Sequence, residues 1–204
     1  DHFHNALRSY TRARKPDRPG FQPSLYNLAI LYDPAERLPP SDEDALERFR
    51  KIGEDMRIDV ERITRKDYER IPEFDALFIR VTTAINHYTY RFARKAELEG
   101  LAVIDDTQSI LRCANKVILS ELLNRHKLPT PKSETINRNT FNEADIRGLE
   151  QSLGYPMVLK IPDGSFSRGT LKAENRIQLI DYAGQLLKSS RLILAQEFVY
   201  TKFD

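Results

Sequence analysis

The stretch LAILYDP at residues 28–34 decides the fold of the first half of the chain. Its apolar and aromatic residues follow one another without a polar interruption, and the run then stops at an Asp-Pro pair. A strand of this composition is typical of a sheet whose two faces are both covered by helices. The stretch therefore predicts a strand buried in a parallel sheet.

Helical and strand patterns alternate after this strand. Residues 41–44 resemble a capping box, and apolar residues at three- and four-residue spacing continue a helix to residue 56. Further strands are predicted at 58–61, 76–79 and 101–104, with a helix at 85–96. Parallel neighbours need long crossover connections, so this order predicts an α/β fold with a doubly wound parallel sheet.

Polar residues follow the predicted parallel strands at their carboxyl ends. They are Asp33, residues 80–86 and residues 105–109. Ligands of such sheets gather beyond the carboxyl ends of the strands, which makes these residues candidates for binding. Polar strand ends are also ordinary loop chemistry, and that alternative stays open.

The pattern changes after residue 128. A helix at about 116–126 is followed by Pro129 and Pro131, which restrict the backbone and remove amide donors. Beyond them, helices are predicted at 140–154, beginning with a capping box at 140–143, and at 177–187, and strands at 157–161, 170–173 and 192–199. We therefore expect a basic N-terminal arm at 1–25, an α/β domain at 26–128 and a small α+β subdomain at 129–204.

Charge and cysteine content exclude several classes of protein. The 32 basic and 30 acidic residues of the 204-residue chain give a formal charge of +2, and residues 1–20 alone contribute +3. Nucleic-acid binding over a broad surface is disfavoured, and the basic arm is either a solvated tail or a contact for a polyanion. A single cysteine, Cys113, allows no intrachain disulfide, which suits a reducing, cytoplasmic setting. No apolar run approaches the roughly 18–20 residues needed to span a membrane.

The loop DGSFSRG at residues 163–169 is the first candidate for phosphate chemistry. It fails the Walker pattern, because Thr170 and Leu171 stand where a lysine and a hydroxyl residue are required. Its backbone donors and serine hydroxyls could still fold over a polyanion. A plain hairpin tip is the alternative.

Two lysines are the second candidate. Lys160 interrupts an apolar run, so it is either an inward ammonium that needs a partner or an ordinary surface lysine. Lys116 opens a helix, where a lysine usually faces solvent. No nucleophile motif such as Gly-x-Ser-x-Gly is present, and the sequence gives no case for nucleophilic catalysis.

The order of these features resembles the ATP-grasp superfamily, and within it the RimK-like carboxylate–amine ligases. The likeness covers residues 26–204, and its first part is similar to the domain that precedes the grasp. The segments that carry it are FDALFIR at 74–80, VIDD at 103–106, ILRCANK at 110–116, LPTP at 128–131, VLK at 158–160 and QEFV at 196–199.

The resemblance implies a set of nucleotide contacts. They are Lys116, Lys160, Ser165, Ser167, Gly169, Glu197, Phe198, Val199 and Asp204. The lysines would reach the phosphates, the loop would close over them, residues 197–199 would meet the adenine edge and the last acid would bind the ribose. Contacts to substrate are expected at Arg80, Thr82, Thr83 and Asn86.

The resemblance also implies a reaction. A carboxylate is activated by ATP as an acyl phosphate, and an amine then attacks it; an amino acid such as glutamate is the expected donor. Magnesium ligands are expected beyond residue 204, so we expect residues 1–204 alone to be inactive. The alternative is a non-catalytic recognition module with a degenerate grasp half, and a homo-oligomer is left open. A nicotinamide oxidoreductase is disfavoured, because no Gly-x-Gly-x-x-Gly follows the first strand.

Overall fold

The computed structural model describes residues 24–164 and 169–202. The chain divides into two compact units, residues 1–110 and 111–204. The predicted arm up to residue 23 and the predicted contacts Ser165, Ser167 and Asp204 lie outside the described residues.

A four-stranded parallel sheet forms the centre of the first unit, as predicted. Its order is β2-β1-β3-β4, so the chain moves first to one side of β1 and then to the other. The strands are β1 (Tyr26–Leu31), β2 (Ile58–Ile63), β3 (Ala76–Ile79) and β4 (Ala102–Ile104). Residues Ala29, Ile30 and Leu31 are fully buried, which confirms that the opening apolar run is a buried strand of the parallel sheet.

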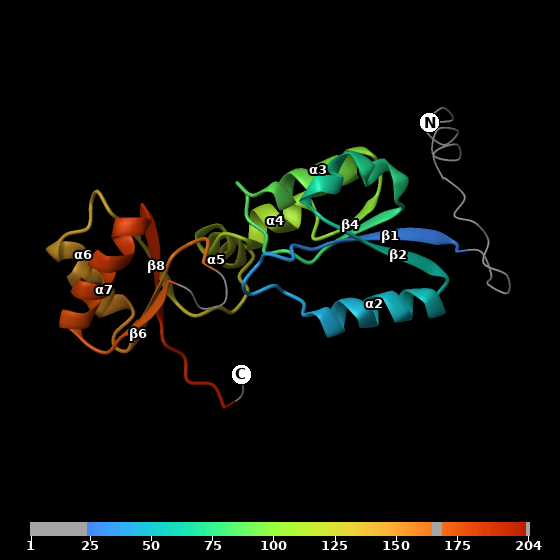
Figure 1. Cartoon of the computed structure of the whole chain (residues 1–204). Coiled ribbons are helices and arrows are strands. Elements are labelled where there is room, and N and C mark those ends of the chain that lie inside the picture. The colour runs from blue at the N-terminus through green and yellow to red at the C-terminus, as the bar shows by residue number, and fades with distance from the viewer. Residues whose placement is uncertain (1–23, 165–168, 203–204) are drawn as a thin grey trace. The chain divides into compact units, whose positions relative to one another are not determined.

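Helices cover both faces of this sheet. The helix α2 (Glu43–Asp55) lies on one face and α3 (Tyr88–Leu98) on the other (Figure 1). The sequence patterns did not predict the 3-10 helix η1 (Arg65–Glu73), which contains Pro72, or the boundaries of α4 (Thr107–Cys113). In η1, Thr64 and Asp67 form the capping box that starts the helix.

Short polar side chains start the helices, at positions that partly differ from those predicted. Asp42 caps α2 by accepting a hydrogen bond from the Ala45 amide at 2.8 Å. The capping box predicted to begin at Thr140 is wrong, because the Thr140 amide is held by the Asn137 carbonyl in a turn. Asn142 and Asp145 form the capping box of α6 (Glu143–Ser152) instead.

The second unit contains an antiparallel sheet of order β5-β8-β6-β7. The strands are β5 (Ser133–Asn137), β6 (Met157–Lys160), β7 (Thr170–Ala173) and β8 (Leu192–Glu197). One face packs against α6 and α7 (Arg176–Ser189) through buried residues such as Met157, Leu159 and Ile193. The α+β character of this half is therefore as expected, although β5 was not predicted.

The helix α5 (Lys116–Arg125) belongs to the second unit, where it packs against β8. The compact units thus divide at residue 110, while the domain boundary expected at residue 128 stays a prediction about the subdomains of the family. Across the ranges 24–164 and 169–202, no helix combines the length and apolar character needed to cross a membrane.

Candidate functional site

Lys160 lies on the face of the second sheet opposite to α6 and α7. Pairing in β6 puts Met157 and Leu159 into the helix-covered core, so Val158 and Lys160 point the other way. Gln196 stands opposite Val158 on the neighbouring strand, and its Oε1 accepts a hydrogen bond from Lys160 Nζ at 2.8 Å. Partial burial lowers the pKa of Lys160.

The N-terminus of α5 is anchored on the loop that follows β6. Asn115 caps the helix through Oδ1, and its Nδ2 donates to Asp163 Oδ1 at 2.9 Å. The Lys116 amide donates to the Pro162 carbonyl at 3.0 Å, and the Lys116 ammonium donates to the Gly164 carbonyl. Residues 48 positions apart in the sequence, Asn115 with Asp163 and Lys116 with Gly164, are thereby brought together.

Lys160 acts electrostatically on Lys116. Burial lowers the pKa of Lys116, and the Lys160 ammonium lowers it further, while Asp163 raises it. Their bonded partners are neutral oxygens, and within the described ranges no carboxylate forms an ion pair with either ammonium. Two adjacent cations with neutral partners are suited to a polyanion, because each retains charge that the protein does not neutralise.

Gly169 closes the loop on its far side for two local reasons. Its φ of +66° lies in the left-handed region, and a Cβ there would stand 2.5 Å from Ile161 Cδ1. Its carbonyl accepts from the Ile161 amide at 2.9 Å. The glycine is therefore required by backbone conformation and by close packing against Ile161, and its predicted contact with phosphate stays a prediction.

The end of β8 and the residues that follow it, 197–199, present two backbone groups, one acceptor and one donor. The Glu197 amide donates to the Lys132 carbonyl at 2.9 Å, and the Lys132 amide donates to the Glu197 carboxylate at 2.7 Å. The Phe198 amide donates to the Pro156 carbonyl at 3.3 Å. Among the described residues, the Glu197 carbonyl and the Val199 amide have no backbone partner, so one acceptor and one donor remain available two residues apart.

An aromatic and cationic surface continues from this segment. Lys172 Nζ lies 4.1 Å from the centroid of the Phe198 ring, and the Tyr200 ring lies 4.8 Å from the Phe198 ring. Sequence reasoning missed Gln196, Lys172 and Tyr200. A polar residue within the apolar strand LILAQE was the signal that could have revealed Gln196.

Comparison with protein-family models finds no match. The chain is 36% identical over 86 residues to an alpha-aminoadipate–LysW ligase of Saccharolobus solfataricus, covering 42% of this chain and 30% of that protein. It is 29% identical over 137 residues to a probable alpha-L-glutamate ligase of Teredinibacter turnerae, covering 66% of this chain and 44% of that protein. The match thus spans 30% and 44% of the length of these two curated relatives.

Solved structures share the fold. A RimK-domain ATP-grasp protein of Sphaerobacter thermophilus matches 86% of this chain and 65% of its own, with a TM-score of 0.62 and 19% identity. In sequence and fold the chain is thus similar to proteins of the RimK-like ATP-grasp superfamily. A D-alanine–D-alanine ligase of Bacillus anthracis complexed with ATP matches 86% of this chain and 57% of its own, with a TM-score of 0.64 and 15% identity.

Arg80, a predicted substrate contact, forms its hydrogen bonds within the first unit. Its Nε donates to Ser41 Oγ at 2.8 Å, and its Nη2 donates to the Pro40 carbonyl at 2.7 Å. The guanidinium also lies 5.1 Å from the centroid of the Phe78 ring. These contacts hold the segment before α2 against the end of β3.

The other predicted substrate contacts lie on the segment between β3 and α3. Thr82 donates its amide and hydroxyl to the Glu36 carboxylate, whereas Thr83 is partly buried and Asn86 is exposed. Tyr88 donates to Asp33 Oδ2 at 3.4 Å, and burial together with Asp33 raises the pKa of Tyr88 to about 12. The end of β1 is thus joined to α3 by internal hydrogen bonds.

Metal ligands were expected outside residues 1–204. Within the part of the chain that the structure describes, no group of three or more His, Cys, Asp or Glu side chains is placed to hold a metal ion.

Proposed function

We propose that this chain forms the adenine- and phosphate-binding part of an ATP-dependent carboxylate–amine ligase. The observation that carries the proposal is that Lys116, held on the loop that follows β6, lies within electrostatic range of Lys160 at the end of β6. Each ammonium has a neutral protein partner, so both retain charge for the phosphate oxygens of ATP.

The adenine ring is recognised by the segment after β8. The Glu197 carbonyl accepts from the exocyclic amino group, and the Val199 amide donates to the neighbouring ring nitrogen. Val158, on the same face of the sheet as Lys160, offers apolar surface to the ring. In this proposal the adenine ring is recognised by backbone groups, so it is the position of the backbone at residues 197–199, and not their side chains, that determines recognition.

The ligase step follows the names of the relatives, which are ligases acting with amino acids. ATP activates a carboxylate as an acyl phosphate, and an amine displaces phosphate to form the amide; glutamate is the donor that we propose. Residues 116 and 160 hold the phosphates during this transfer. Magnesium neutralises phosphate charge in such reactions. The described residues offer no set of ligands for it, so none of the proposed residue roles involves the metal. We expect no turnover by residues 1–204 alone.

Calorimetric titration with ATP tests the proposal directly. We expect Lys160→Met to weaken ATP binding about tenfold or more, because a charge-assisted hydrogen bond contributes roughly 1.5–3 kcal/mol. Lys188→Met, which removes an exposed lysine from the last turn of α7, is the matched control and leaves the affinity unchanged. Equal affinities of the two variants, or no ATP binding by the unchanged chain, would contradict the proposal.

A further inference from the structure

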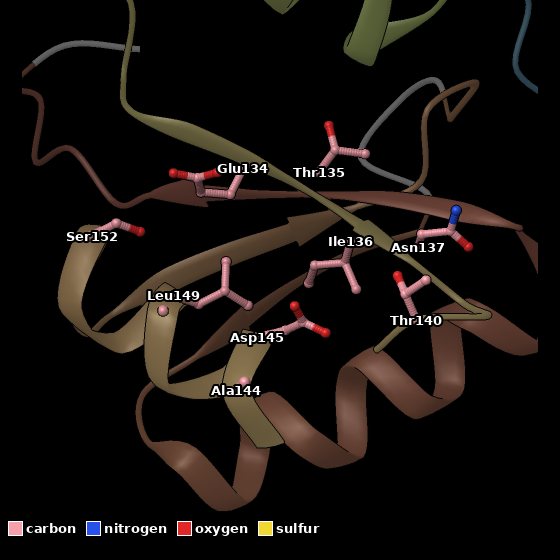
Figure 2. Close-up of a pocket in the computed structure, with 10 residues that line it drawn as sticks. Glu134, Thr135, Ile136, Asn137, Thr140, Ala144, Asp145, Leu149 and Ser152 are labelled. Atoms are coloured by element: carbon pink, nitrogen blue, oxygen red, sulfur yellow. The ribbon is translucent and has the colours of Figure 1, made fainter. Parts of the chain in front are cut away.

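A groove of about 300 Å³ lies between β5 and α6. Lys116 and Lys160 do not line it. Figure 2 shows the strand passing along one side of the groove, with side chains from the helix along the other. Ile136 and Leu149 are buried and form its apolar floor. The nucleotide proposal uses none of these residues.

One wall of the groove is an open sheet edge. Among the strands of the described residues, β5 pairs with β8 alone. The bonds from the Glu197 amide to the Lys132 carbonyl and from the Arg138 amide to the Arg191 carbonyl set which residues of β5 bond to β8. In antiparallel pairing every second residue then bonds to β8. The amide and carbonyl of Thr135 therefore point to the open edge, where a further strand can pair with them.

The other wall is shaped by small side chains on α6. Ala144, Gly148 and Ser152 follow each other at four-residue spacing and therefore share one face of the helix. A Cβ placed on Gly148 would meet no atom within 4 Å, so the space above it is free. This gap between helix and edge strand leaves room for the side chains of an added strand.

The groove is acidic and contains an unpaired hydroxyl. Two of its lining residues, Glu134 and Asp145, are acidic, and none of the lining residues is basic. Glu134 is exposed and has no ion pair within the described residues. Ser152 Oγ is buried without a hydrogen-bond partner in the described structure. Both features favour an occupant that brings donors and positive charge.

We propose that this groove binds an extended peptide segment bearing lysine or arginine side chains, which adds a strand to the open edge of β5. The peptide backbone pairs with Thr135, and its inward side chains rest over Gly148 and reach Glu134 and Asp145. A second copy of the chain fits less well, because antiparallel pairing of two β5 strands about Thr135 would set Lys132 of one copy opposite Arg138 of the other. The proposal goes beyond the ligase function and does not depend on it.

Fluorescence anisotropy with short probes tests the chemistry of the occupant. The probes are labelled, acetylated and amidated hexapeptides that alternate valine with lysine, the same peptide with glutamate for lysine, and the lysine peptide N-methylated at alternate amides. We expect saturable binding of the lysine peptide and binding of the glutamate peptide that is about tenfold weaker or more. N-methylation can be placed on either of the two alternating sets of amides, and we expect loss of binding when the methylated set is the one that faces β5. The bound lysine peptide also slows hydrogen exchange of the Thr135 amide.

Two glycine variants locate the site. Gly148→Leu fills the groove and is expected to weaken the lysine peptide about tenfold, without loss of folding, because leucine favours the helix over glycine. Gly184→Leu is the matched control, since a Cβ there also meets no atom within 4 Å but lies on α7 outside the groove. ATP binding is unchanged in both variants.

Three outcomes would overturn the proposal: equal binding of the lysine and glutamate peptides, unchanged peptide binding by Gly148→Leu, or failure of the lysine peptide to bind. Sedimentation of the free chain that shows self-association abolished by Gly148→Leu would replace the peptide with a second copy and would equally overturn it.

Discussion

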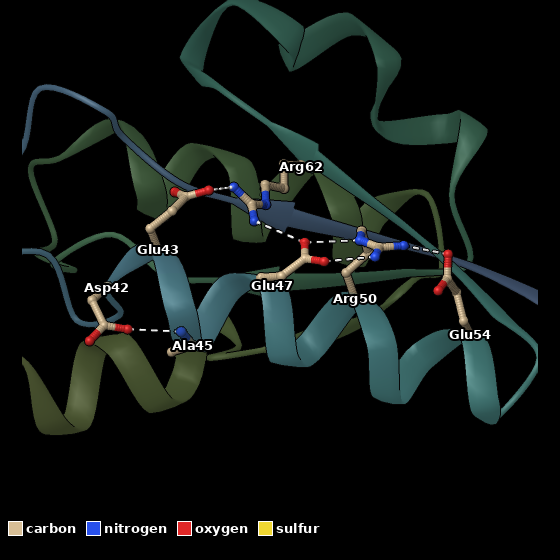
Figure 3. A network of polar contacts seen from close by, with 7 residues as sticks. All are labelled: Asp42, Glu43, Ala45, Glu47, Arg50, Glu54 and Arg62. Carbon is tan, nitrogen blue, oxygen red and sulfur yellow. Dashed lines mark hydrogen bonds and ion pairs between the residues drawn. The ribbon is translucent and has the colours of Figure 1, made fainter.

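Arg50 and Arg62 of the first unit and the two lysines of the second unit are held in opposite ways. In the first unit Arg62 contacts Glu43 and Glu47, and Arg50 contacts Glu47 and Glu54, as Figure 3 shows along α2. In the second unit Lys116 and Lys160 donate to a backbone carbonyl and a side-chain amide oxygen.

This difference separates structural charge from charge available to a ligand. Exposed ion pairs such as those of Arg50 contribute little to stability, and their charges cancel locally. Two partly buried ammonium groups with neutral partners lower folding stability, and an anion that binds between them restores the lost solvation. Within the described residues, Lys116 and Lys160 therefore retain charge that no carboxylate neutralises through an ion pair.

The largest expected effect comes from giving Lys160 a carboxylate partner. Gln196→Glu replaces the amide that accepts from Lys160 Nζ at 2.8 Å, so the lysine gains an ion pair of the kind found in the first unit. We expect ATP affinity to fall about tenfold, because the cation is neutralised, while the free energy of unfolding rises by roughly 1 kcal/mol. Calorimetry and urea unfolding measure the two quantities.

Gln151→Glu controls for the added negative charge, because Gln151 is an exposed residue of α6. We expect it to leave ATP affinity unchanged. A Gln196→Glu variant that binds ATP as tightly as the unchanged chain would show that Lys160 does not hold phosphate.

A smaller effect is expected from a carboxylate of the first unit. Asp67 accepts from the Thr64 amide at 2.8 Å, and this bond is the main cause that lowers the pKa of Asp67, with a further contribution from Arg70. Its stabilisation is present above pH 3.8 and is lost as the pH falls through the lowered pKa. Asp67→Asn should cost about 1 kcal/mol at neutral pH and flatten the acid limb of urea unfolding.

The second sheet provides the control for this prediction. Its amides should keep their hydrogen-exchange protection in Asp67→Asn, because the capping box lies wholly within the first unit. An acid limb as steep as that of the unchanged chain would mean that Asp67 does not carry the acid sensitivity.

The fold could be predicted from the sequence where the apolar composition of a strand indicates that the strand is buried. The run at 28–34 is apolar because both faces of β1 are covered, and the parallel order followed from it. The strand β5, with sequence SETIN, was missed because it is a polar edge strand with one buried residue, Ile136. Pro72 similarly concealed η1, since proline is unfavourable inside a helix.

The site was predictable in its residue types but not in its geometry. Sequence reasoning left open whether Lys160 points inward or outward; pairing with β8 places it on the face opposite the helix-covered core, partly buried beside Gln196. The anchoring of Lys116 on the loop depends on contacts across 48 residues, which no local pattern contains. The roles assigned to both lysines and to residues 197–199 stay predictions.

The smallest expected effect is an alkaline change in the second unit. Burial lowers the pKa of Lys160 below its ordinary value of 10.5, so the charged lysine destabilises the folded state at neutral pH. As the pH rises through the lowered pKa, the folded state loses this proton first, and the penalty disappears by pH 10.5. The free energy of unfolding of Lys160→Met relative to the unchanged chain should therefore fall between neutral pH and 10.5.

Taking the difference between two chains removes the ionisation of the tyrosines, which is common to both. Urea unfolding followed by circular dichroism measures the difference at each pH. Arg62→Met should show a difference that does not vary over the same interval, because arginine stays protonated and its charge is already paired. A difference for Lys160→Met that is equally constant would mean that the lysine is solvated as fully as an ordinary surface residue, and the contrast between the two units would then rest on Lys116 alone.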